Sequence, residues 1–181
     1  ETELELSGPT DVIEMHSREL TLEGASFTAA GKTEPLTIEL DPSRQIVRFR
    51  AAAPLRATRG RLRVRFAGPL AASMHGIYLA TDGTARAVCT QCEATDARAI
   101  FPCFDEPEFK AEIEWSIHTA DGLVALSNGP LVEQKLVAGK RQFRFAPTRK
   151  VSSYLAALAI GDFEGSAERV VEGIPLKVWA T

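Results

Sequence analysis

The strongest constraint on the fold is a regular alternation of apolar and polar residues in short runs. Residues 36–40 read LTIEL, and residues 61–66 read RLRVRF. In an extended segment, successive side chains point to opposite faces, so such runs are typical of strands with one buried and one solvated face. Parallel sheets, which are buried on both faces, show continuous apolar runs instead. The pattern therefore predicts antiparallel sheets.

Turn-forming residues separate these runs at close spacing. Gly8-Pro9 and Asp41-Pro42 break the chain early, and Ala138-Gly139-Lys140 lies between two alternating runs as the loop of a predicted hairpin. Residues 154–160, YLAALAI, are apolar on both faces and favour a buried strand, with a helix as the alternative because alanine is frequent there. Many short strands joined by such turns predict an all-β sandwich.

One central segment departs from this alternation. Residues 90–111 read TQCEATDARAIFPCFDEPEFKA and mix charges, prolines and aromatic residues. Because the period of two is lost, we expect a short irregular or helical turn near residues 95–110 instead of a strand. This central segment differs most from an ordinary β domain and is the strongest candidate for a functional region.

Four charged residues of the central segment, Asp96, Arg98, Asp105 and Glu106, stand among apolar neighbours. A charge in apolar surroundings is costly unless it is solvated or paired. We therefore predict that the four side chains form a network of ion pairs and hydrogen bonds that fixes the segment. The adjacent carboxylates of Asp105 and Glu106 diverge on any backbone, so they do not predict an acid–base pair.

The overall charge does not indicate a polyanionic partner. The chain of 181 residues carries 21 basic and 24 acidic residues, a net charge of −3. The arginines at 59, 61, 63 and 65 could contact phosphate, but we predict that they line a solvated sheet face and pair with acids such as Glu39. No apolar run approaches the roughly 20 residues that cross a bilayer. The sequence thus predicts no nucleic-acid partner and no membrane partner.

Metal and redox chemistry have little support in the sequence. It contains three separated histidines and no HExxH, P-loop or GxSxG motif. Cys89 and Cys92 form one CxxC, whereas a structural zinc needs four ligands. A zinc-binding or redox-active module built on them stays an alternative to the preferred interpretation, buried and reduced thiols. We predict no metal site and no catalytic residue in this chain. An odd count of three cysteines favours a reducing compartment, and we expect a cytoplasmic protein.

The central segment resembles the N-terminal domain signature of the M1 zinc aminopeptidases, the group of aminopeptidase N and leukotriene A4 hydrolase. Four other segments resemble the same family in the same order: MHGIY at 74–78, ALSNGP at 125–130, VSSYL through GDF at 151–163 and GIPLKV at 173–178. The resemblance implies a saddle-like antiparallel β-sandwich over residues 1–181 as a single domain. The HExxH zinc motif and the GAMEN exopeptidase motif of the family are absent, so we expect a fragment whose catalytic domain follows Thr181.

The resemblance also implies a function. In the family, the glutamine and the glutamate of the TQxE segment reach the active-site cleft, and here they are Gln91 and Glu93. Both have the same parity on an extended segment, so both can point to one side. The expectation is a domain that binds the amino terminus of a peptide substrate for a zinc aminopeptidase. The zinc and the hydrolysis would belong to the catalytic domain of the same polypeptide, and this chain alone would be inactive. The alternative is a non-catalytic scaffold domain with the same fold.

Overall fold

The computed structural model describes all residues, 1–181, as β-strands joined by turns and loops. Its helical segments are two single 3₁₀ turns, η1 (Ala97–Ala99) and η2 (Ser153–Leu155). The first of these lies within the irregular or helical turn that the sequence predicts near residues 95–110. The predicted all-β, antiparallel fold class is confirmed. The molecule has no helix that is long and apolar enough to span a bilayer.

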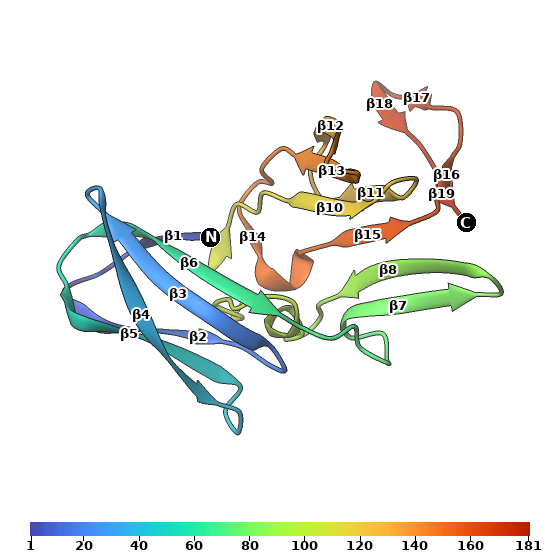
Figure 1. Cartoon of the computed structure of the whole chain (residues 1–181). Helices are drawn as coiled ribbons and strands as arrows, with labels where there is room; N and C mark the ends of the chain where they lie inside the picture. Colours follow the sequence, from blue (N-terminus) through green and yellow to red (C-terminus); the bar gives the residue numbers. More distant parts are fainter.

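The first third of the chain forms a six-stranded sheet that is strongly twisted and curled (Figure 1). Its strands pair in the order β1-β6-β3-β4-β5-β2, and every pairing is antiparallel. The two edge strands follow each other in the sequence, and the sheet between them curls into a half-barrel. The strands are β1 (Thr2–Glu5), β2 (Thr10–His16), β3 (Thr21–Ala29), β4 (Lys32–Asp41), β5 (Ile46–Leu55) and β6 (Arg59–Ala67).

The apolar positions of these strands build the largest core of the molecule. Phe27, Val47, Phe49 and Leu62 are fully buried in it, and burial of such a side chain stabilises the fold by roughly 1.5–3 kcal/mol. Gly60 on β6 lies directly against Phe27, because a Cβ built at this glycine would come within 2.1 Å of the ring atom Cζ. A glycine is therefore needed where the strand passes over the aromatic ring.

The polar positions of the same strands form a charged outer face. Each arginine of β6 pairs with a glutamate on or next to a neighbouring strand: Arg59 with Glu5, Arg61 with Glu3, Arg63 with Glu1 and Arg65 with Glu23. The predicted cross-strand pairing of these arginines is confirmed, but the suggested partner Glu39 is wrong. Because β4 lies beside β5, the Glu39 carboxylate pairs with Arg50 at 2.7 Å.

The chain after β6 builds two smaller sheets around a second core. A four-stranded sheet has the order β11-β15-β8-β7, and a three-stranded sheet has the order β10-β13-β12. Their core consists of Ile117, Ala125, Phe143, Phe145 and Leu158. The strands are β7 (Gly76–Asp82), β8 (Ala85–Gln91), β10 (Ser116–Ala120), β11 (Val124–Ser127), β12 (Leu131–Val137), β13 (Lys140–Phe145) and β15 (Leu158–Gly161).

Three short two-stranded pairs complete the fold. One of them, the hairpin β17–β18, projects away from the rest of the molecule near the C-terminus (Figure 1). The pairs are β9 (Lys110–Ala111) with β14 (Val151–Ser152), β16 (Glu164–Gly165) with β19 (Trp179–Ala180), and β17 (Arg169–Val171) with β18 (Ile174–Leu176).

The hairpin predicted around residues 138–140 is confirmed by the pairing of β12 with β13. Ala138 and Gly139 both take a positive φ, 50° and 76°. A two-residue hairpin loop requires such a backbone because its twist then matches that of the flanking strands. Gly139 adopts this conformation at no steric cost.

The buried strand predicted over residues 154–160 is wrong in its first half. The chain forms η2 there, and β15 begins only at Leu158. The side chain of Asn128 explains the difference: Nδ2 donates to the Leu155 carbonyl at 2.9 Å, and Oδ1 accepts from the Ala157 N–H at 2.7 Å. A side chain thus satisfies backbone groups that a longer strand would have used in its ladder.

Candidate functional site

The central segment lies where the six-stranded sheet meets the later sheets (Figure 1). Backbone hydrogen bonds in both directions join Cys103 to His16 at the end of β2, with N···O distances of 2.8 and 3.1 Å. Phe104 packs against the core of the six-stranded sheet. Cys92 and Cys103 share a third buried cluster with Ala156, which follows η2. The central segment is thus the junction between the two halves of the molecule.

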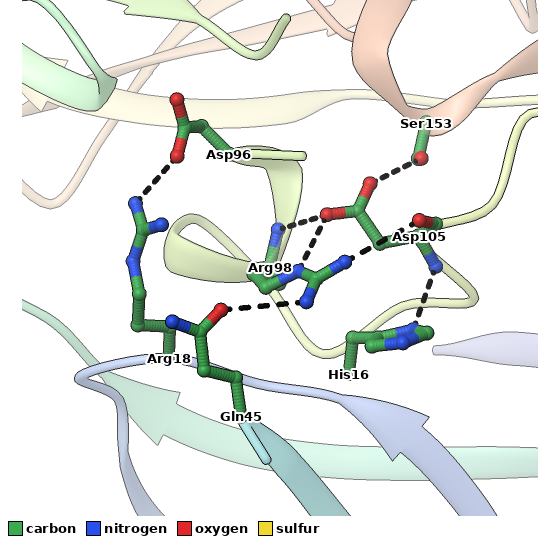
Figure 2. A network of polar contacts seen from close by, with 7 residues as sticks. All are labelled: His16, Arg18, Gln45, Asp96, Arg98, Asp105 and Ser153. Atoms are coloured by element: carbon green, nitrogen blue, oxygen red, sulfur yellow. Dashed lines mark hydrogen bonds and ion pairs between the residues drawn. The ribbon is translucent and has the colours of Figure 1, made fainter. Parts of the chain in front are cut away.

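A buried ion pair between Arg98 and Asp105 holds this junction together (Figure 2). Arg98 Nε donates to Asp105 Oδ2 at 2.9 Å, and the Asp105 side chain is 1% exposed. The other oxygen of Asp105 accepts from Ser153 Oγ at 2.6 Å. Arg98 also donates to the Gln45 side chain at 3.3 Å, and the Asp105 N–H donates to His16 Nδ1 at 3.2 Å. Because both charges have several partners, the cost of burying them is offset.

The two outer acids of the predicted network have different surroundings. The Asp96 carboxylate, which is mostly buried, accepts from Arg18 Nη2 at 2.7 Å and from His75 Nδ1 at 3.0 Å. Glu106 is exposed, and its side chain makes no hydrogen bond or ion pair. Only its backbone carbonyl is used, to close a turn at the surface. The network therefore does not include Glu106.

Sequence reasoning missed the partners that these charges use. Arg18 and Gln45 come from two loops of the six-stranded sheet, His75 precedes β7, and Ser153 opens η2. They lie 21 to 78 residues away from the charges they contact. No motif or spacing connects residues at such separations, so only the three-dimensional fold brings them together. Arg18 and His75 also line a cavity of about 390 Å³ beside the segment.

Gln91 and Glu93 are exposed on either side of the buried Cys92, whose exposed fraction is 2%. Gln91 ends β8, and Glu93 lies in the turn that follows. Cys92 Sγ donates inward to the Ala156 carbonyl at 3.2 Å. Neither Gln91 nor Glu93 makes a side-chain hydrogen bond or an ion pair with any other residue of the chain. The pair therefore presents one carboxylate and one amide with all their hydrogen-bonding capacity free.

The three cysteines are free thiols in apolar surroundings. Burial, together with the charges of Asp105 and Asp96, raises the pKa of Cys92 to about 12. Burial also raises the pKa of Cys89 and of Cys103. Thiols with such pKa values are protonated at neutral pH, and a protonated thiol is a poor nucleophile. No three His, Cys, Asp or Glu side chains lie close enough to one another to hold a metal ion.

Comparison with known proteins identifies the family. The sequence matches the profile of the peptidase M1 N-terminal domain over residues 1–155. The chain belongs to the peptidase M1 family. The resemblance of the central segment is thereby confirmed, and so is the fold type that it implied. The matched residues include all members of the polar network in Figure 2 and the Gln91–Glu93 pair.

This M1 domain is similar to aminopeptidases along nearly its whole length. It is 35% identical to the endoplasmic reticulum aminopeptidase 1 of Homo sapiens, across 98% of this chain and 20% of that protein. It is 32% identical to the puromycin-sensitive aminopeptidase of Caenorhabditis elegans, across 94% and 19%. It is 33% identical to an aminopeptidase N of Acetobacter pasteurianus, across 98% and 51%. The chain thus spans about a fifth of the length of the first two relatives.

Proposed function

We propose that this M1 domain binds the amino terminus of peptide substrates for a zinc aminopeptidase, and that Glu93 receives the substrate α-ammonium group. The observation that carries the proposal is a solvent-exposed carboxylate with no partner in its own chain. The mostly buried carboxylates of Asp96 and Asp105 nearby are both paired within the chain. Glu93 is available for a cation supplied from outside.

The chemistry of the pair suits an amino terminus. An α-ammonium group has three N–H donors and a positive charge, and a carboxylate accepts from it through charge-assisted hydrogen bonds, which are stronger than neutral ones. Gln91 offers both a donor and an acceptor and can line the pocket for the first side chain of the substrate. A peptide with a blocked amino terminus would lose the charge and leave Glu93 unpaired.

The proposal assigns hydrolysis to another part of the polypeptide. Zinc held by a catalytic domain would supply the activated water, and this domain would contribute only to recognition of the substrate. The hairpin β17–β18 is a suitable contact surface for that catalytic domain, because Val171, Ile174 and Leu176 share one of its faces and are at least half exposed there. Exposed apolar clusters of this kind mark interaction sites.

The proposal is tested by replacing Glu93 in the full-length protein. Glu93→Ala should lower kcat/KM for peptides with a free amino terminus. The lost transition-state stabilisation should be roughly 2–5 kcal/mol, the usual loss when one partner of a charge pair that is buried in the complex is removed. Glu106→Ala is the matched control, because Glu106 is also an exposed acid without a partner, and it should behave as the wild type. Wild-type turnover in the Glu93→Ala enzyme would contradict the assignment. A full-length protein without peptidase activity would favour the scaffold alternative.

A further inference from the structure

The turn that carries Glu93 is closed by one backbone hydrogen bond. The Asp96 N–H donates to the Cys92 carbonyl at 2.9 Å, so residues 92–96 form a single turn with Glu93 next to its first residue. One hydrogen bond fixes several backbone dihedrals only weakly, and an isolated turn of this kind opens easily. The side chains at the two ends of this turn supply further support from two directions.

At the first end, Cys92 attaches the turn to the segment that links η2 to β15. Its thiol donates to the Ala156 carbonyl at 3.2 Å. Ala156 belongs to the short segment between η2 and β15, which Asn128 holds through hydrogen bonds to Leu155 and Ala157. Cys92 therefore connects the turn to a segment that is itself fixed on both sides.

At the other end, Asp96 attaches the turn to two further loops. Its carboxylate accepts from Arg18, in the loop after β2, and from His75, in the loop before β7. His75 immediately precedes Gly76, which pairs with Gln91 across β7 and β8. The Asp96 contacts therefore support the turn with Glu93 and also the strand end with Gln91.

We propose that Cys92 and Asp96 are positioning residues that hold Glu93 ready for the α-ammonium group of the substrate. This inference rests on the function proposed above. A turn that is already fixed keeps the backbone of Glu93 in place, so less conformational freedom is lost when the ammonium group binds and more of the hydrogen-bond energy counts towards affinity. Neither Cys92 nor Asp96 needs to touch the substrate, because both act through the geometry of the turn.

The test is a double-mutant cycle in the full-length enzyme. KM and kcat are measured on the best substrate from a panel of aminoacyl 4-nitroanilides. Cys92→Ala removes the thiol donor and should raise KM about threefold to tenfold with kcat nearly unchanged, which is the loss expected for one hydrogen bond that acts on binding. Cys92→Ser keeps a donor of similar size and should restore KM. In a Glu93→Ala background, Cys92→Ala should have no further effect.

Asp96→Asn provides a second variant that does not depend on the buried thiol. It keeps the size of the side chain but removes the charge that binds Arg18, and it should also raise KM by about threefold or more. The inference is overturned if both variants leave KM unchanged, or if their effects persist undiminished when Glu93 is already alanine. A Glu93→Ala enzyme with wild-type KM and kcat would instead overturn the proposed function.

Discussion

The six-stranded sheet and the hairpin β17–β18 place their apolar side chains in opposite ways. The sheet buries eight apolar residues in one core and covers its other face with ion pairs. The hairpin leaves every apolar residue of its two strands at least half exposed, and Val170 is 66% exposed. A surface of that kind is stable when another protein surface covers it. The comparison indicates that the sheet holds most of the buried core of the molecule, whereas the hairpin adds little to it.

The largest effect expected from this comparison is the loss of a core aromatic residue. Phe49 is 0% exposed in the six-stranded sheet, so Phe49→Ala should destabilise the chain by about 3–5 kcal/mol through lost burial and the cavity left behind. Val170→Ala in the hairpin should change the free energy of unfolding by less than about 0.5 kcal/mol. Urea denaturation of the two variants measures both values. Similar losses in both would remove the distinction between the two regions.

The junction between the regions should be nearly as sensitive as the core. Arg98→Ala leaves the buried carboxylate of Asp105 without its counter-charge, which should cost about 3 kcal/mol. Glu106→Ala, in the same segment but without side-chain contacts, should leave stability unchanged. Thermal unfolding of both variants compares them directly, and an unchanged melting temperature for Arg98→Ala would show that the ion pair does not hold the halves together.

Alkaline pH should destabilise the chain through its buried thiols, none of which belongs to the six-stranded sheet. The pKa of Cys92 rises from 9.0 to about 12 in the folded state, mainly through burial. Above about pH 9 the thiol ionises only in the unfolded chain, so stability falls between pH 9 and 12, by up to about 1.4 kcal/mol per pH unit. Denaturation at pH 8 and pH 10.5 tests this expectation. Cys92→Ala should lose less stability than the wild type, and equal losses would contradict it.

The sequence allowed most of the first region to be predicted, because its signals are local. The alternation at residues 61–66 indicates by itself which side chains face the core and which face solvent, and the predicted charged face is present. The second region was harder to predict. Residues 154–160 are apolar enough for a strand, yet Asn128, from a distant turn, binds the backbone there and a 3₁₀ turn forms instead. Hydrophobic periodicity contains no information about such a side chain.

The candidate site shows the same limit more strongly. Gln91 and Glu93 could be selected only through the resemblance to a family, since a lone glutamate near a turn is usually an ordinary surface residue. Arg18 reaches Asp96 across 78 residues, and the sequence around either one does not indicate the contact. Glu106 stood beside Asp105 in the same charged run but points to water. Neighbours in the sequence were therefore a poor guide to partners in the site.

The smallest change in stability is expected for a substitution on the charged face of the sheet. Measuring it separates the contribution of the ion pairs to stability from that of the buried core. Arg65 pairs with Glu23 across β3 and β6 at 3.2 Å, and its side chain is 78% exposed. Exposed pairs gain little because water already solvates both charges, so Arg65→Ala should shift the melting temperature by at most about 2 °C. The shift should shrink further in concentrated salt, which screens exposed charges. A shift as large as that of Phe49→Ala would mean that the outer face, and not the buried core, makes this sheet the stable half of the molecule.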